Sequence, residues 1–77
     1  MTKLYSAEWC GACRTVRNAL NARGIKYTYI DVDYHSEEVA MLGIRSIPVV
    51  VRDDGERMTG ISGGMGKLIE FVEGGSK

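Results

Sequence analysis

The spacing of hydrophobic residues predicts two amphipathic helices in this chain. Between positions 10 and 23, apolar side chains recur three and seven residues apart, at Cys13, Val16 and Leu20, and polar residues occupy the other faces. Gly24 then stands where a glycine commonly ends a helix. The same periodicity returns near the end of the chain, at Met65, Leu68, Ile69 and Val72.

Four other segments have the composition of β-strands. They are residues 3–6, 26–33, 49–52 and 56–61. The β-branched run that begins at Val49 is typical of a strand buried on both faces. The sequence Asp53-Asp54-Gly55 predicts a hairpin turn between the last two strands. A short helix is expected before them, capped by Ser36 and ended by Gly43.

The predicted order is therefore β-α-β-α-β-β-α. Strands separated by helices are expected to be parallel and joined by right-handed crossovers, whereas the final hairpin is antiparallel. This order predicts an α/β fold with a four-stranded mixed sheet flanked by three helices on both faces. A chain of 77 residues has room for one hydrophobic core region, so residues 1–77 are expected to form a single domain.

The amino-acid composition indicates which kinds of partner the protein does not attract. Hydrophobic residues make up 44% of the chain and charged residues 26%, an ordinary globular balance. Ten basic side chains offset ten acidic ones, so no net field attracts nucleic acid or an anionic membrane. The longest apolar stretch, residues 47–51, is too short for a signal peptide or a membrane span. We expect a cytoplasmic protein, in a compartment that keeps thiols reduced.

The two cysteines stand three residues apart, at the predicted start of the first helix. Residues at this spacing share a helix face, so the sulfurs of Cys10 and Cys13 can approach within disulfide range. Cys10 falls at the helix N-terminus, where free N–H groups and the positive end of the dipole favour a thiolate. Cys13 lies on the apolar stripe and is expected to be more buried and to keep its proton longer. Cys10 is thus the predicted nucleophile and Cys13 the resolving thiol.

Three other uses of the cysteines are less well supported. A zinc site needs about four ligands, and only His35 remains as a further nitrogen or sulfur donor, so we expect no metal. A structural disulfide across so short a loop would remove little entropy from the unfolded chain. Thiols that merely fill the core would not explain the glycine at the helix start. Redox chemistry is favoured.

Two motifs carry a resemblance to a known family. Residues 7–14, Ala-Glu-Trp-Cys-Gly-Ala-Cys-Arg, resemble the active-site segment of thioredoxins, and residues 43–48, Gly-Ile-Arg-Ser-Ile-Pro, resemble their cis-proline loop. In length the chain is similar to glutaredoxins, particularly the small glutaredoxin-like redoxins that donate electrons to ribonucleotide reductase. The resemblance covers essentially the whole chain and implies the thioredoxin fold.

The resemblance also implies roles for individual residues. Cys10 and Cys13 would be catalytic. Substrate-binding positions would be Trp9, Gly11, Ala12, Ile47, Pro48, Gly63 and Gly64. Trp9 would be a partly exposed platform, Pro48 would form a cis bond facing the cysteines, and Ile47 would offer its backbone to an extended substrate peptide.

The chain departs from the thioredoxin pattern beneath the active site. The buried aspartate that assists thiol proton transfer in thioredoxins would fall at Leu4, and its lysine neighbour at Tyr29. Deprotonation of Cys13 must therefore rely on water, on the substrate or on another group. The basic residue that glutaredoxins place shortly before the first cysteine is also absent, since Ser6-Ala7-Glu8 stands there.

The resulting hypothesis is a dithiol–disulfide oxidoreductase that reduces partner-protein disulfides. It would need no bound cofactor, because glutathione or a thioredoxin reductase would supply electrons from outside, and we expect a monomer. The resemblance makes ribonucleotide reductase a candidate partner. The alternatives are a glutathione-dependent glutaredoxin, a non-enzymatic docking module, and a carrier that holds zinc or a shared iron–sulfur cluster through Cys10.

Overall fold

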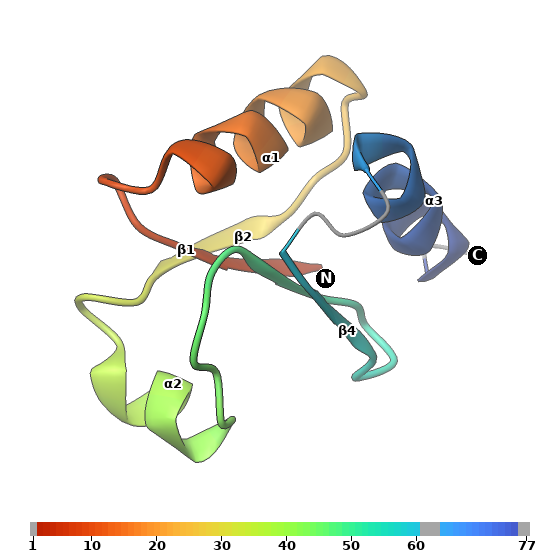
Figure 1. Ribbon diagram of the computed structural model, residues 1–77. Helices are drawn as coiled ribbons and strands as arrows, with labels where there is room; N and C mark the ends of the chain where they lie inside the picture. Colours follow the sequence, from red (N-terminus) through yellow and green to blue (C-terminus); the bar gives the residue numbers. More distant parts are fainter. Residues whose placement is uncertain (1, 61–63, 76–77) are drawn as a thin grey trace.

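The computed structural model describes residues 2–60 and 64–75 and confirms the predicted order of elements (Figure 1). The elements are β1 (Lys3–Ser6), α1 (Gly11–Ala22), β2 (Thr28–Asp31), α2 (Ser36–Met41), β3 (Val49–Val51), β4 (Arg57–Thr59) and α3 (Met65–Gly75). The second and fourth strands are shorter than expected, at four and three residues. None of the helices within these ranges is long and apolar enough to cross a membrane.

The four strands form one mixed sheet in the order β2-β1-β3-β4. Strand β1 pairs in parallel with β2, as predicted for two strands joined through α1. Strand β3 pairs antiparallel with β1 and with β4, so the parallel relation expected across α2 is wrong. The six residues of α2 rise only about 9 Å and do not carry the chain back along the sheet. Instead β3 begins beside the end of β1, where Val49 pairs with Tyr5.

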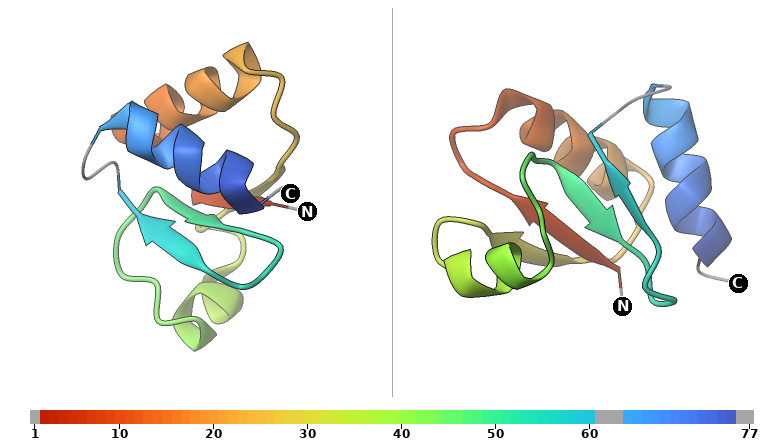
Figure 2. Two further views of the ribbon diagram at one scale, coloured as in Figure 1. Left: turned by 90° about the vertical axis from the view of Figure 1, so that its right-hand side faces the viewer. Right: turned by 60° about the horizontal axis from the view of Figure 1, so that its bottom comes forward.

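Helices cover both faces of the sheet, as predicted, and each face has its own hydrophobic core. Helices α1 and α3 lie on one face and α2 lies on the other (Figure 2). The first core consists of Leu4, Val16, Leu20, Val50, Leu68, Ile69 and Val72. The second consists of Tyr5, Ile30 and Val49, with Val39 and Ile44 packed against it. The neighbours Val49 and Val50 therefore point to opposite faces, which confirms that β3 is buried on both sides.

Two glycines end α1 and α2 in the same way. Gly24 and Gly43 both have φ +68°, which an L side chain rarely adopts. After Gly24, the N–H of Ile25 donates to the carbonyl of Leu20 at 3.0 Å. After Gly43, the N–H of Ile44 donates to the carbonyl of Val39 at 3.1 Å. Each glycine thus completes a Schellman motif and turns an isoleucine back onto the core.

The start of α2 corrects one prediction. His35, with φ −130°, is the N-cap, and Ser36 is already the first helical residue. The reason is that the His35 carbonyl accepts the Val39 N–H at 3.0 Å, which begins the helix one residue earlier. The His35 side chain makes no capping hydrogen bond.

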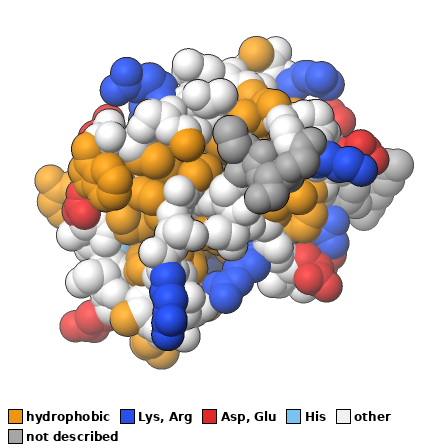
Figure 3. Space-filling view, viewed as in Figure 1, with side chains coloured by type: hydrophobic (Ala, Val, Ile, Leu, Met, Phe, Trp, Pro, Cys, Tyr) orange, Lys and Arg blue, Asp and Glu red, His pale blue; other side chains and the backbone are white. Residues whose placement is uncertain are grey.

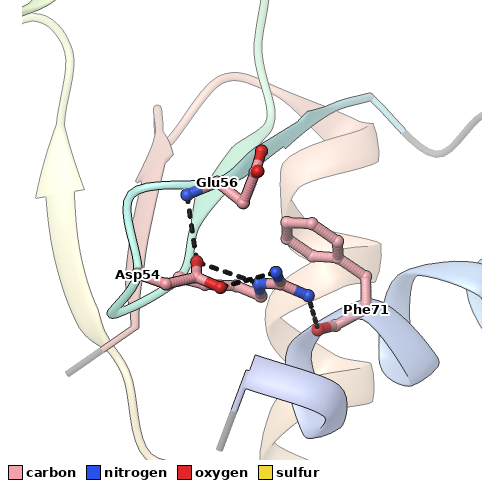
Figure 4. A network of polar contacts seen from close by, with 4 residues as sticks. Asp54, Glu56 and Phe71 are labelled. Carbon is pink, nitrogen blue, oxygen red and sulfur yellow. Dashed lines mark hydrogen bonds and ion pairs between the residues drawn. The ribbon is translucent and has the colours of Figure 1, made fainter.

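The β3–β4 hairpin is tied to α3 by one arginine (Figure 4). The Gly55 N–H donates to the Arg52 carbonyl at 3.0 Å, which confirms the predicted turn. The Arg52 guanidinium binds the Asp54 carboxylate at 2.7 Å and holds the pKa of Asp54 below its usual range. It also donates to the Phe71 carbonyl at 3.3 Å and lies 4.5 Å from the centre of the Phe71 ring. These contacts fix the last helix against the edge of the sheet.

Candidate active site

Cys10 is held at the N-terminus of α1, as the sequence predicts. It is the N-cap residue, with an extended backbone at φ −90° and ψ 113°. Its Sγ accepts the backbone N–H of Cys13 at 3.2 Å, in the position that a serine or aspartate oxygen often takes at a helix start. Both cysteines are free thiols, and Cys10 is half-buried. The Cys10 sulfur therefore meets an N–H donor on the protein side and remains accessible on the other side.

Cys13 lies one turn inside α1 and is completely buried. Burial, with a further contribution from the adjacent Cys10 sulfur, raises the pKa of the Cys13 thiol to about 11. The backbone of Ala7 and the hydroxyl of Ser6 act in the opposite direction on the same thiol. The prediction that Cys13 is more buried than Cys10 is confirmed, and the raised pKa of Cys13 agrees with a thiol that keeps its proton longer.

Trp9 is an exposed residue beside the cysteines. Its side chain is 71% exposed, which fits the predicted platform and excludes a core position. The indole Nε1–H donates to the Asp33 carboxylate at 2.9 Å and so anchors the ring to the chain that follows β2. Gly11 and Ala12, the two residues between the cysteines, are also exposed. Asp33 has no chemical motif around it in the sequence, and only the structure reveals its contact with Trp9.

A shallow apolar groove of about 150 Å³ begins at Trp9. Its lining residues are Trp9, Val32, Val39, Ile44, Arg45, Ser46 and Ile47. Figure 3 shows hydrophobic side chains gathered on the side of the molecule where the β1–α1 loop lies. Trp9 and Ile47, far apart in the sequence, thus share one groove. Sequence reasoning missed Val32, Val39 and Ile44, which pattern alone assigns to ordinary core packing.

Pro48 follows this groove, and the peptide bond between Ile47 and Pro48 is cis, as predicted. Pro48 is buried, and its carbonyl accepts the Gly60 N–H at 2.7 Å. Gly64 is exposed at the start of α3, where its carbonyl accepts the Leu68 N–H at 3.4 Å. Gly63, the other member of the predicted glycine pair, lies outside the described residues. Among residues 2–60 and 64–75, no three His, Cys, Asp or Glu side chains come together to hold a metal ion.

An accessible cysteine at a helix N-terminus and a buried cysteine one turn inside the same helix, on a four-stranded mixed sheet, are typical of the thiol–disulfide oxidoreductases of the thioredoxin fold. Comparison with known proteins agrees. Residues 2–56 match the glutaredoxin family model, and the chain belongs to this family. A protein of Mycobacterium tuberculosis described as a glutaredoxin is 30% identical over 61 residues, which cover 73% of each chain.

Two solved structures with this fold are similar to the chain, one a thioredoxin and the other a glutaredoxin-like protein. Thioredoxin from Fasciola hepatica superposes with a TM-score of 0.75 at 26% identity, covering 94% of this chain and 76% of that one. The glutaredoxin-like protein NrdH-redoxin from Escherichia coli superposes with a TM-score of 0.65 at 27% identity, covering 77% of this chain and 80% of that one. The chain is therefore a small thioredoxin-fold redoxin with thiol–disulfide oxidoreductase activity.

Proposed function

We propose that this redoxin reduces disulfides of partner proteins, with Cys10 as the nucleophile and Cys13 as the resolving thiol. The observation that carries the assignment is the asymmetry of the pair. Cys10 is accessible and accepts an N–H donor through its sulfur, whereas Cys13 is fully buried. Only Cys10 can meet the sulfur of a bulky partner, and Cys13 can reach only Cys10.

The reaction then has two exchanges. The Cys10 thiolate attacks one sulfur of the partner disulfide, so that a mixed disulfide forms and the other partner sulfur leaves as a thiolate. Cys13 next gives up its proton and attacks the Cys10 sulfur. The Cys10–Cys13 bond forms, the second partner sulfur leaves, and both partner thiolates take protons from the solvent. The partner gains two electrons, and this chain is left oxidised.

The groove supports a protein substrate. It is open, shallow and mostly apolar, and it runs from Trp9, beside the nucleophile, to Ile47, which precedes the cis-proline. An extended segment next to the partner's disulfide can lie along such a surface and bury an apolar side chain. Trp9, Gly11, Ala12, Ile47 and Pro48 are the binding residues in this proposal, with the glycine pair at 63–64 at its margin.

The proposal also names an electron source and a partner protein. Membership of the glutaredoxin family supports glutathione as the reductant. The likeness to NrdH-redoxin, a glutaredoxin-like protein with a thioredoxin-like activity profile, supports thioredoxin reductase. Ribonucleotide reductase stays the candidate partner that the sequence resemblance implies. We propose that the protein acts as a cytoplasmic single-domain monomer without a metal or bound cofactor.

A disulfide-reduction assay with two electron sources tests these points. NADPH is supplied either with thioredoxin reductase or with glutathione and glutathione reductase, and insulin is the substrate. Activity in only one arm identifies the reductant. Cys10→Ser is expected to abolish turnover, whereas Cys13→Ser is expected to accumulate a mixed disulfide with the partner, visible by mass spectrometry. Turnover that survives Cys10→Ser would contradict the assignment, and biological activity that survives loss of both cysteines would favour the docking alternative.

A further inference from the structure

Ser6, the last residue of β1, is a buried polar residue without an evident structural purpose. Its side chain is fully buried, and its Oγ has no hydrogen-bond partner among the described residues. A buried hydroxyl left without a partner costs about 1–3 kcal/mol, so native structures rarely keep one without a reason. The fold itself does not supply that reason, because β1 pairs with β2 through its backbone: the Val32 N–H donates to the Ser6 carbonyl at 2.9 Å.

The position of Ser6 places its side chain beneath the active site. Side chains alternate along a strand, so Ser6 shares the face of Leu4 rather than that of Tyr5. Leu4 belongs to the core under α1 together with Val16, and Tyr5 belongs to the core on the α2 side. The hydroxyl of Ser6 is therefore buried between β1 and the first turn of α1, where the only buried thiol of the described residues, Cys13, also lies.

The Ser6 hydroxyl influences the protonation of the Cys13 thiol. The Ser6 hydroxyl lowers the pKa of the Cys13 thiol, and the Ala7 backbone does the same, although burial outweighs both. A group that lowers this pKa interacts more favourably with the thiolate than with the thiol. In the structure the Ser6 hydroxyl makes no regular hydrogen bond, so no other group competes for its proton.

We propose that Ser6 is a positioning residue for the resolving step, whose hydroxyl turns to donate a hydrogen bond to the Cys13 thiolate as that thiolate forms. The inference rests on the role of Cys13 proposed above. The Cys13 proton leaves to solvent, and Ser6 keeps its own proton. Its hydrogen bond offsets part of the cost of a buried negative charge until Cys13 attacks the Cys10 sulfur. No carboxylate is needed beneath the thiol, which agrees with leucine at position 4.

Ser6→Ala tests this role by the pH dependence of resolution. The mixed disulfide between Cys10 and a small thiol is prepared at acidic pH, where Cys13 stays protonated and does not attack, and release of that thiol after a jump to each test pH is followed by stopped flow. A hydrogen bond to a charged sulfur predicts that Ser6→Ala slows release about tenfold near neutral pH and moves the pH profile upward. Ser6→Thr should restore the rate. Thr2→Ala, which removes another buried hydroxyl just before β1, should leave it unchanged.

The free energy of unfolding of Ser6→Ala shows whether Ser6 acts in the resolving step or only stabilises the fold. Since the Ser6 hydroxyl is unpartnered, Ser6→Ala is expected to keep or raise the free energy of unfolding. If Ser6→Ala does not fold, the near-isosteric pair Ser6→Thr and Ser6→Val, which differ in a hydroxyl, gives the same comparison. An unchanged pH profile in the variant without the hydroxyl would overturn the inference.

A second measurement distinguishes failure of this inference from failure of the proposed function. In a Cys10→Ser background, the ultraviolet absorbance of the thiolate followed across pH reports the titration of Cys13 without any turnover and without a reagent that must reach the buried sulfur. Ser6→Ala should raise that titration midpoint relative to Cys10→Ser alone, and an unchanged midpoint would count against Ser6. Turnover that persists in Cys10→Ser would instead refute the assignment of the nucleophile and leave the titration result standing.

Discussion

At the scale of single residues, burial gives the two cysteines different tasks. They are three positions apart on one helix, yet Cys10 caps the helix and Cys13 faces the core. The raised pKa of Cys13 follows from solvation, because a thiolate in the interior loses its hydration and a thiol loses much less. Ser6 and the Ala7 backbone moderate this cost without removing it.

The burial of Cys13 predicts a pH dependence of folding stability. Its pKa rises from 9.0, the ordinary thiol value, to about 11 in the folded protein. Below pH 9 both states hold the proton and stability is complete. Between pH 9 and pH 11 the unfolded chain releases the proton and the folded chain keeps it, so the free energy of unfolding falls. Urea denaturation of the reduced protein at several pH values across this window measures the fall.

A matched pair of variants assigns this effect to its residue. Cys13→Ala should flatten the profile between pH 9 and 11, whereas Cys10→Ala should keep most of the fall, because burial is the largest cause of the raised pKa and the Cys10 sulfur a smaller one. Tyr5 contributes separately, because burial and its hydrogen bond to Glu38 raise the pKa of Tyr5 to about 12. Both measurements are therefore made in a Tyr5→Phe background. An unaltered slope in the Cys13 variant would contradict this account.

At the scale of elements, the end of α2 matters more for function than its length. The Schellman motif at Gly43 turns Ile44 onto Val39, and both side chains line the groove that runs to Ile47. The motif at Gly24 has the same geometry, but it ends α1 away from the groove. The same local structure therefore supports only packing at Gly24, whereas at Gly43 it also shapes the proposed substrate groove.

Alanine at each glycine tests this distinction. A Cβ at Gly24 or Gly43 would meet no atom within 4 Å, so the cost is the strained backbone at φ +68°. Both substitutions are expected to lower the free energy of unfolding by about 1 kcal/mol. Gly43→Ala should also raise KM for a protein disulfide, measured with insulin, while Gly24→Ala should leave KM unchanged. Equal effects on KM would show that the groove does not depend on this turn.

At the scale of the whole molecule, two small cores share one central pair of strands. Strands β1 and β3 each send side chains to both faces, so the α2 side and the α1–α3 side are linked through the same backbone. A chain of 77 residues gains from this arrangement because little of its central sheet is left in contact with solvent.

Val49 and Val50 test whether both faces stabilise the fold. They are adjacent, each is 1% exposed, and they point into different cores. Val49→Ala and Val50→Ala are each expected to lower the free energy of unfolding by about 2 kcal/mol, because each leaves a small cavity. Chemical denaturation of both variants checks this. A near-neutral result for Val49→Ala would mean that the α2 face is held mainly by its turn and not by its core.

The sequence by itself determined the features that depend on neighbours along the chain. Periodicity placed α1 and α3, glycines marked the helix ends, and the spacing of Cys10 and Cys13 located the reactive pair at a helix start. These predictions hold because hydrogen bonds within a helix join residues three or four positions apart. The local pattern also indicated that Val49 begins a strand buried on both sides.

Only the tertiary structure decided the features that depend on what a side chain faces. The direction of β3 was set by where α2 returns the chain, and the cap of α2 by the backbone of His35. The groove joins Trp9 to Val39 across distant segments. A hydrophobic pattern records that a residue is buried but not against which partner. For the same reason Ser6, an ordinary serine in the sequence, acquired its proposed role only when the fold buried it beside Cys13.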